Sequence, residues 1–344
     1  MKNNVYIVES PTQLMSAIEA KANNNGYSFL IVNYGGVERA ENLKQIKTLV
    51  KSTCWDYIFE ITQSSSTYIN ILLVFYFTVK FRMKLKPKLT RVYIGEYRYY
   101  FFQILAKVLS TRKPVLLDDG TVTIMLQKKY FSKGKGLKSY FRDSNKKTYY
   151  FILLYSYIFR FKLDDRPPDL YSIFNLDGWL VDKQCNDRPQ STPKEVEMLN
   201  EFYFFGAKYS EVGLFSLEVE LLLLRFSFDY IKKNQNIPVN YVAHRDDSDK
   251  KISAIKNLGI EVRRLGEPCE IHFSKNSFAP KFIGGFYTTS LITLPSLFKI
   301  KEVISFNLSE YVKNKDIKDN IHSIYEYLKS HNVKVVDVDL IDPN

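Results

Sequence analysis

The stretch VYIVESPTQLMSAIEA, residues 5–20, sets a pattern that much of the chain repeats. Val5 to Val8 are β-favouring residues without polar alternation, which is typical of a strand buried on both faces. The polar segment ESPTQ follows, and after it Met15, Ile18 and Ala20 have the spacing of one helix face. This stretch therefore predicts a strand, a loop and a helix, the first unit of an α/β fold.

Further short apolar runs, separated by helical stretches, predict parallel sheets wrapped by helices. In the first part of the chain the predicted strands are 29–32, 57–61, 92–94 and 115–117. After the polar, proline-containing segment 182–194, the pattern starts again with predicted strands at 202–205, 239–243, 262–265, 282–285 and 303–306 and a long helix at 214–231. We therefore predict two domains, residues 1–188 and 189–344.

Two α/β units of similar size predict an α/β protein of two Rossmann-like domains facing a cleft, the GT-B architecture. Ligands bind such sheets at the carboxyl ends of the strands, so the polar loops that follow strands are the candidate functional sites. Fold class alone does not give a function, and the prediction of function depends on those loops.

The composition is that of a globular protein, with 344 residues of which 45% are apolar and 25% charged. This excludes disordered and fibrous classes. The three cysteines are widely spaced and form no CxxC pair, which favours a reducing compartment. The first residues contain no apolar run long enough for a signal peptide, so we expect a cytoplasmic protein.

The formal net charge of +12 favours partners that carry phosphates, anionic lipid or nucleic acid. The basic residues lie beside two apolar, aromatic runs, 69–79 and 149–159, each shorter than the ~20 residues that span a bilayer. They are Lys80, Arg82, Lys84, Lys86, Lys88 and Arg91 after the first run, and Lys133, Lys135, Lys138, Lys146 and Lys147 before the second. We expect peripheral binding to the cytoplasmic face of the inner membrane, with two buried core helices as the alternative. No nucleic acid partner is expected, because no nucleic-acid-binding motif accompanies the charge; a basic nucleic-acid-binding protein is the distant alternative.

Four polar segments follow predicted strands, and each has a structural as well as a functional interpretation. In Leu117-Asp118-Asp119-Gly120, one carboxylate could act as a general base, although the sequence also suits a turn. Adjacent side chains of extended backbone point in opposite directions, so only one of the two aspartates should reach a reacting hydroxyl. The segment ending in His244-Arg245 offers an imidazole beside a guanidinium, or a histidine bonded to backbone.

The other two segments carry a carboxylate and a group of hydroxyls. Glu270, in Glu267-Pro-Cys-Glu270, could accept both hydroxyl protons of a vicinal diol, or lie on a surface loop. In the segment from Gly284 to Ser290, hydroxyls lie beside free backbone N–H groups at a helix start, which makes an anion site or a helix cap.

These segments, and the order in which they follow one another, resemble motifs of the bacterial sialyltransferases. That group includes lipooligosaccharide enzymes of the glycosyltransferase family 52 type, multifunctional enzymes and polysialyltransferases. The resemblance spans about residues 118–295. It implies inverting transfer of sialic acid, or a related nonulosonic acid, from a CMP-sugar to a glycan acceptor of lipopolysaccharide, O-antigen or capsule, which includes acceptors linked to a lipid. It also implies that residues 1–188 bind the acceptor and residues 189–344 bind the donor.

The resemblance assigns a role to each matching residue. Asp119 corresponds to the general base and His244 to the histidine that faces the phosphate of CMP, followed by Arg245 where the family has proline. Glu270 corresponds to the ribose-binding carboxylate, and Thr288 and Thr289 to a serine pair next to Ser290. Weaker matches are Gly206 for the donor, and Ser10, Gln13 and Asp118 for the acceptor.

No cofactor or metal is expected. His272, His322 and His331 do not lie at ligand spacing with a cysteine or carboxylate cluster, and Asp246, Asp247 and Asp249 are expected to form a solvated turn. A polymerising enzyme, and a transferase for legionaminic, pseudaminic or Kdo-type sugars, are the alternatives within the same enzyme class.

Overall fold

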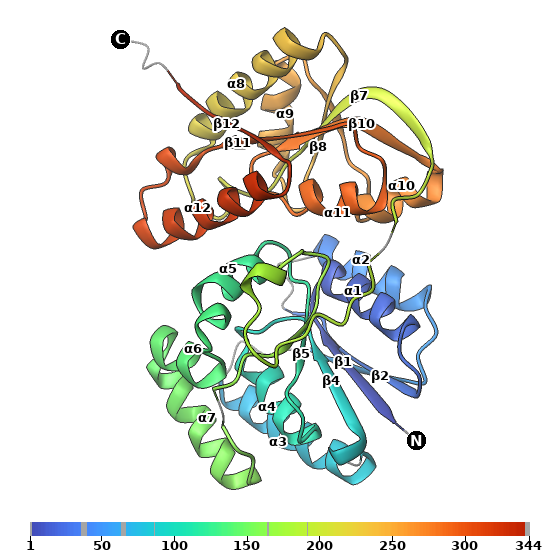
Figure 1. The fold of residues 1–344 in the computed structure, drawn as a ribbon, viewed down its shortest axis with the longest axis vertical. Helices are drawn as coiled ribbons and strands as arrows, with labels where there is room; N and C mark the ends of the chain where they lie inside the picture. The colour runs from blue at the N-terminus through green and yellow to red at the C-terminus, as the bar shows by residue number, and fades with distance from the viewer. Residues whose placement is uncertain are drawn as a thin grey trace. The chain divides into compact units, whose positions relative to one another are not determined.

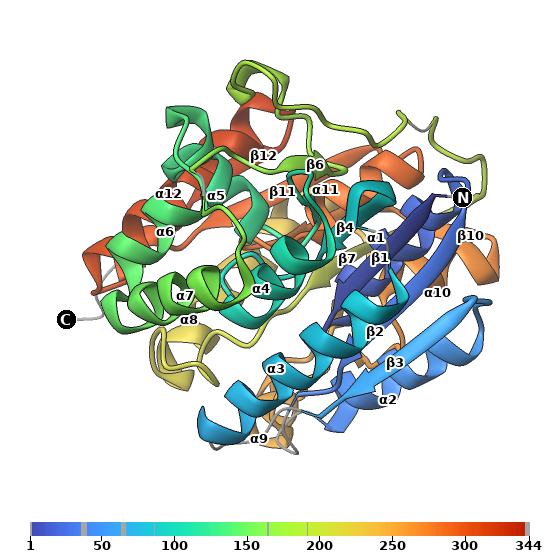
Figure 2. The same ribbon diagram turned by 90° about the horizontal axis from the view of Figure 1, so that it is seen from below.

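The computed structural model describes residues 2–35, 40–62, 67–85, 87–163, 165–190 and 192–340 (Figures 1 and 2). The chain divides into two compact units, residues 1–189 and 190–344, called here the N-terminal and the C-terminal unit. The division lies one residue from the boundary that the polar segment suggests. Each unit has one six-stranded parallel sheet with helices on both faces, which confirms the predicted α/β fold class.

The sheet of the N-terminal unit has the order β3-β2-β1-β4-β5-β6, and all its strand pairs are parallel. The strands are β1 (Asn3–Val8), β2 (Tyr27–Asn33), β3 (Tyr57–Ile61), β4 (Thr90–Ile94), β5 (Val115–Leu117) and β6 (Asp169–Tyr171). The helices are α1 (Pro11–Ala22), α2 (Ala40–Lys51), α3 (Thr67–Lys84), α4 (Tyr100–Leu109), α5 (Val122–Lys129), α6 (Leu137–Ser144) and α7 (Lys146–Phe159), with 3-10 turns η1 (Pro87–Leu89), η2 (Phe131–Lys133) and η3 (Asp177–Trp179).

The C-terminal unit repeats this strand order, as β9-β8-β7-β10-β11-β12, again with all pairs parallel. The strands are β7 (Glu197–Phe205), β8 (Val239–Val242), β9 (Glu261–Arg263), β10 (Phe278–Gly285), β11 (Glu302–Asn307) and β12 (Lys334–Asp337). The helices are α8 (Leu217–Gln235), α9 (Asp249–Asn257), α10 (Cys269–Asn276), α11 (Ser290–Leu297) and α12 (Lys315–Ser330), with one 3-10 turn, η4 (Ser309–Tyr311).

Burial explains why the central strands read as continuous apolar runs. Helices α1 and α2 cover one face of the first sheet, and α3 and α4 cover the other (Figures 1 and 2). Residues 4–8 of β1 are buried throughout, as are residues 202–205 of β7. Neither face of these strands meets water, so polar alternation would place unpaired polar groups in the core.

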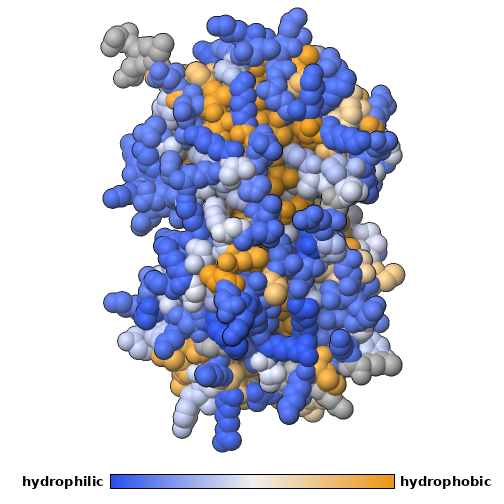
Figure 3. Space-filling view, in the orientation of Figure 1, coloured by the Kyte–Doolittle hydropathy of each residue, from blue (hydrophilic) through white to orange (hydrophobic). Residues whose placement is uncertain are grey.

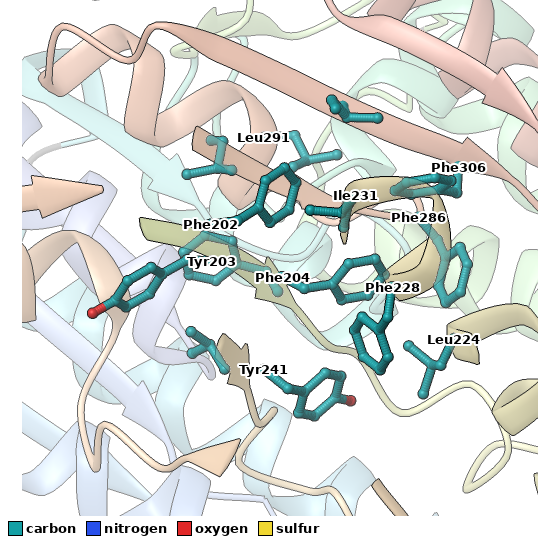
Figure 4. Packing of buried hydrophobic residues seen from close by; sticks show 14 of the residues in the cluster. Phe202, Tyr203, Phe204, Leu224, Phe228, Ile231, Tyr241, Phe286, Leu291 and Phe306 are labelled. Carbon is teal, nitrogen blue, oxygen red and sulfur yellow. The ribbon is translucent and has the colours of Figure 1, made fainter. Parts of the chain in front are cut away.

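Aromatic side chains form much of the core of the C-terminal unit (Figure 4). The ring of Phe204 on β7 lies with its centroid 5.4 Å from that of Phe228 on α8 and 5.4 Å from that of Phe286 after β10, both in edge-to-face geometry. Each such pair contributes about 0.5–1.5 kcal/mol beyond its buried area. These contacts pack the middle strand β7 against α8 and against the segment that follows β10.

In both units the strand order reverses at one place. The chain moves outward from β1 to β3 and returns to β4 beside β1, and it does the same from β7 to β9 and back to β10 beside β7. The loops after these central strands diverge to opposite faces of the sheet. Such switch points, at the carboxyl ends of the strands, are where ligands bind in open α/β sheets.

Candidate active site

The first group of polar side chains lies at the switch point of the N-terminal unit, where β1 ends. Ser10 is the N-cap of α1, and its hydroxyl accepts the backbone N–H of Gln13 at 3.3 Å. The buried Gln13 amide accepts the backbone N–H of Glu9 at 2.8 Å and donates to Asp119 Oδ1 at 2.7 Å. Gln13 therefore ties the end of β1 to the loop after β5.

The loop after β4 reaches the same carboxylate from the other side. Glu96 is buried and accepts the backbone N–H and the guanidinium of Arg98, while Arg98 Nη2 lies 3.3 Å from Asp119 Oδ2. Gly95 is needed here, because a Cβ at this position would lie 2.3 Å from Gln13 Oε1. We call Gln13, Glu96, Arg98 and Asp119 the Asp119 cluster.

Asp119 has the protonation behaviour of a base that works near neutrality. Burial, followed by the charge of Glu96, raises its pKa to about 7, while Arg98 and Gln13 oppose the shift. A carboxylate with such a pKa accepts a proton better than an ordinary aspartate and is still partly ionised at neutral pH. The cluster can therefore hold and activate a hydroxyl group.

Asp118 points away from Asp119, as extended backbone predicts. Its buried carboxylate accepts the hydroxyl of Ser172 at 2.5 Å and the backbone N–H of Ile173 at 2.7 Å, so it fixes the loop after β6. Burial raises the pKa of Asp118 to about 6, and the Ser172 hydrogen bond counteracts this. The two aspartates thus have different surroundings and different partners.

The second group lies in the C-terminal unit, where β8 ends. The backbone N–H of His244 donates to Asp247 Oδ2 at 2.9 Å, and His244 Nδ1 accepts the backbone N–H of Asp246 at 3.1 Å. Since Nδ1 is an acceptor, the proton of the neutral ring is assigned to Nε2. The side chain is partly exposed, so this Nε2–H is a donor that a ligand can use.

His244 does not titrate near neutrality in the free protein. Burial and the charge of Arg245 lower its pKa to about 4, with further contributions from Lys208 and Lys251. In the unliganded chain the imidazole of His244 is therefore neutral at neutral pH. A bound anion would oppose the effect of these cations and raise the pKa.

A buried ion cluster lies beneath the His244 loop, and it corrects one prediction. Asp247 was expected in a solvated turn, but it is 4% exposed, and only Asp249 is fully in water. Lys251 Nζ lies 2.9 Å from Asp247 Oδ1 and 3.5 Å from Glu211, contacts Glu220, and donates to the carbonyl of Ala207 at 2.7 Å. The sequence does not show that Lys251, four residues after Asp247, is itself buried against this carboxylate together with Glu220 of α8.

Gly206, at the end of β7, is required by the same network. Its backbone N–H donates to the carbonyl of Val242 at 2.9 Å, and a Cβ at this position would lie 2.0 Å from the hydroxyl of Tyr241. That hydroxyl donates to Asp247 Oδ2 at 2.9 Å. The glycine thus gives Tyr241 the room to hold the carboxylate that receives the His244 N–H.

The hydroxyl-rich segment follows β10. Thr289 is the N-cap residue of α11 but makes no side-chain capping bond, which leaves its hydroxyl for other partners. Gly285 approaches β7 closely, because its Cβ would lie 2.8 Å from the carbonyl oxygen of Phe205 and 3.0 Å from Thr288 Cγ2. The hydroxyl of Ser290 lies 3.4 Å from the sulfur of Cys269.

Glu270 lies in the first turn of α10, next to this segment. Its Oε1 accepts the hydroxyl of Thr293 at 2.5 Å, and its Oε2 lies 3.4 Å from the sulfur of Cys269. Glu270 is partly exposed and retains acceptor capacity, since each carboxylate oxygen can accept more than one proton.

The structure therefore brings the sequence-predicted residues together in two groups. Asp119, Gln13 and Ser10 lie at one end of the first sheet, with Asp118 turned away. His244, Gly206 and Thr288 follow β8, β7 and β10, which are neighbours in the second sheet, with Arg245, Glu270, Thr289 and Ser290 beside them.

Sequence reasoning missed Glu96, Arg98, Glu220 and Lys251. Glu96 could have been found by the rule that located Asp119, because it comes directly after a predicted strand and a glycine. Glu220 and Lys251 lie within helices that show no local sign of a buried charge. Within the described ranges no group of three or more histidine, cysteine, aspartate or glutamate side chains could hold a metal ion.

Comparison with known proteins gives a match in fold. No family model and no curated protein sequence matches the chain. The α/β-galactoside α-2,3-sialyltransferase of the luminous marine bacterium Photobacterium phosphoreum superposes with a TM-score of 0.51 at 12% identity, over 97% of this chain and 98% of that one. This likeness shows that the chain has the two-domain GT-B fold predicted from its sequence.

Two further solved structures are similar over most of their length. The GT-B domain of a sialyltransferase from Photobacterium damselae has a TM-score of 0.47 at 11% identity, over 98% of this chain and 100% of that one. A UDP-N-acetylglucosamine 2-epimerase has a TM-score of 0.48 at 10% identity, over 96% of this chain and 87% of that one.

Proposed function

We propose that this chain is an inverting glycosyltransferase that moves sialic acid, or a related nonulosonic acid, from a CMP-sugar to a hydroxyl of a glycan acceptor. The main support for the proposal is that Asp119 is a mostly buried carboxylate with a pKa of about 7 and lies at the carboxyl ends of the strands of a parallel sheet. The donor class rests on the ordered motifs from Asp118 to Pro295 and their likeness to sialyltransferase motifs.

In this proposal Asp119 accepts the proton of the acceptor hydroxyl. Gln13 and Arg98 hold one oxygen each, so the carboxylate presents a fixed direction to the acceptor. Burial, together with the charge of Glu96, keeps the pKa of Asp119 high, which makes it a stronger base than an exposed aspartate. The acceptor oxygen forms a bond to the anomeric carbon while the bond from that carbon to the phosphate oxygen breaks, and the configuration inverts.

The C-terminal unit would bind the CMP moiety, first as part of the CMP-sugar donor and then as the leaving group. The Nε2–H of His244 would donate to the phosphate, and the cations Arg245 and Lys208 would stabilise its charge. The hydroxyls of Thr288, Thr289 and Ser290, at the start of α11, would add hydrogen bonds to the nucleotide or to the sugar carboxylate. Glu270 would accept the ribose hydroxyls, and no step requires a metal ion or cofactor.

The test is calorimetric binding of CMP, with UDP and GDP titrated separately as comparison nucleotides. We expect CMP to bind in preference to the other two, and His244→Ala and Glu270→Ala to weaken CMP binding about tenfold or more, since each loses a hydrogen bond to a charged group. His322→Ala is the matched control, because His322 is exposed on α12, and it should bind CMP like the wild type.

A second arm separates donor binding from transfer. Asp119→Asn should bind CMP normally but lose about 10²–10⁴-fold in transfer from a CMP-sugar, because it lacks the base. Binding of UDP or GDP in preference to CMP would overturn the donor assignment, and full transfer activity of Asp119→Asn would overturn the mechanism.

A further inference from the structure

Two helices of the N-terminal unit expose large apolar side chains. On α3, Leu72 is 68% exposed and Met83 is 83% exposed, and Phe75 lies between them on the exposed side. On α7, Tyr157 is 82% exposed, and Tyr150 and Leu154 are exposed on the same face. Figure 3 shows hydrophobic patches among hydrophilic side chains in the region where Figure 1 places α7.

These helices are apolar on nearly all sides. Their opposite faces are buried in the unit, through residues such as Val74 and Phe81 on α3 and Ile152 on α7. A helix that is apolar all round is normally covered on all sides, by protein or by lipid. The alternative of two buried core helices does not hold in full, because each helix is half core and half surface.

The two exposed faces form one surface, called here the α3–α7 surface. The hydroxyl of Tyr155 on α7 donates to the carbonyl of Ile71, in the N-terminal part of α3, at 2.9 Å, which joins the two helices. Arg82 Nη2 donates to the carbonyl of Phe159 at 2.6 Å, and the rings of Phe75 and Phe159 lie 5.6 Å apart. The apolar side chains of both helices are therefore neighbours.

The charged side chains that α3 and α7 contribute to the α3–α7 surface are all positive. Neither helix contains an aspartate or glutamate, whereas Arg82 on α3 and Lys146 and Lys147 on α7 are exposed cations, and Arg160 directly follows α7. Lys86, predicted to belong to this basic group, lies outside the described residues. A second copy of the chain would bring the same positive charge, so charge complementarity favours an acidic partner.

We propose that the α3–α7 surface docks onto a lipid bilayer that contains anionic phospholipid. Leucine, methionine and phenylalanine side chains enter the boundary of the acyl chains, tyrosine rings lie at the level of the headgroups, and the cations pair with lipid phosphates. In the part of the chain that the structure describes, no helix is both long and apolar enough to cross a membrane. This proposal is independent of the enzymatic one.

The test is co-sedimentation of the full chain with vesicles of phosphatidylcholine alone or mixed equally with phosphatidylglycerol. We expect binding to the mixed vesicles, weakened by salt. The double variant Leu72→Ser, Tyr157→Ser should partition onto the mixed vesicles about tenfold or more weakly, because it lacks two large apolar side chains whose transfer from water into the bilayer stabilises binding. The matched control Val212→Ser, Leu222→Ser, at exposed apolar positions of the C-terminal unit, should bind like the wild type.

A charge variant tests the other half of the argument without touching the apolar face. Lys146→Gln with Lys147→Gln should weaken binding to the mixed vesicles about tenfold or more, because each cation near an anionic surface contributes about fivefold. Lys232→Gln with Lys233→Gln, exposed lysines at the end of α8, is its control.

Three outcomes would overturn the proposal. They are absence of binding to the mixed vesicles, equal binding by wild type and both surface variants, and equal binding to the two kinds of vesicle. Sedimentation velocity adds a fourth: a wild-type dimer that Leu72→Ser with Tyr157→Ser makes monomeric would identify the surface as an interface between copies.

Discussion

Replacing Lys251 by methionine tests the buried ion cluster beneath the candidate nucleotide site. The side chains of Lys251 and Asp247 are 0% exposed and that of Glu220 is 1% exposed, so the variant leaves two buried carboxylates without their shared ammonium group. Removing one partner of a buried ion pair costs about 3–5 kcal/mol. We expect a cost at the lower end of this range, because two hydrogen-bond donors stay in place: the N–H of Ser210 still donates to Glu220, and the Tyr241 hydroxyl still donates to Asp247.

We therefore expect Lys251→Met to lose about 3 kcal/mol of unfolding free energy at neutral pH. Burial raises the pKa of Asp247 and of Glu220, and loss of the lysine raises both further. The folded variant then binds more protons than the unfolded chain as the pH falls, so its deficit should shrink under mildly acidic conditions.

The assay is urea unfolding followed by circular dichroism, at neutral and at mildly acidic pH. Lys250→Met changes the exposed neighbouring lysine in the same helix turn and should alter stability by no more than about 0.5 kcal/mol. Lys251→Met combined with Glu220→Gln should recover part of the loss, because one carboxylate is removed. A loss below about 1 kcal/mol, or a loss that does not change with pH, would refute the assignment of this cluster as a buried charge network.

Three further predictions concern the groups around the site. Glu96→Gln should lower the pKa of Asp119 from about 7, because it removes a neighbouring negative charge; carbon NMR titration of the carboxyl measures this, and an unchanged midpoint would contradict it. Gly206→Ala should destabilise the chain by about 1–3 kcal/mol in thermal unfolding, since its Cβ would collide with the Tyr241 hydroxyl, and wild-type stability would contradict that packing. Nitrogen NMR should find His244 neutral and protonated on Nε2 above a pKa of about 4; because this lies below the unfolded value of 6.5, the His244 contribution to stability should increase as the pH rises from about 4 to 6.5, and a midpoint near 6.5 would argue against it.

Local sequence signals located most of the strands, because a strand buried on both faces must be apolar over its whole length. The signal failed for β6 and β12. β6 has three residues and follows two prolines, and β12 is an edge strand with Lys334 and Asp337 at its ends. Such strands form because they pair with the backbone hydrogen-bonding groups of a neighbouring strand, and their own residue pattern does not predict them.

The sequence indicated the Asp119 loop because an acidic pair directly follows an apolar strand. It could not indicate that Gln13, 106 residues away, donates to this carboxylate, or that Arg98 lies on its other side. Those contacts depend on the order of strands in the sheet. Periodicity and motif spacing contain no information about which strand ends become neighbours.

By itself, the sequence determined the α/β class, the two units, most strands and the polar loops at their ends, because hydrophobic burial and turn chemistry act over a few residues. Only the tertiary structure decided the raised pKa of Asp119, the neutral state of His244, the burial of Asp247 and the exposure of the α3–α7 surface. Each of these depends on how much water and charge surround a group, and that is set by segments distant in the chain that pack against it or leave it open.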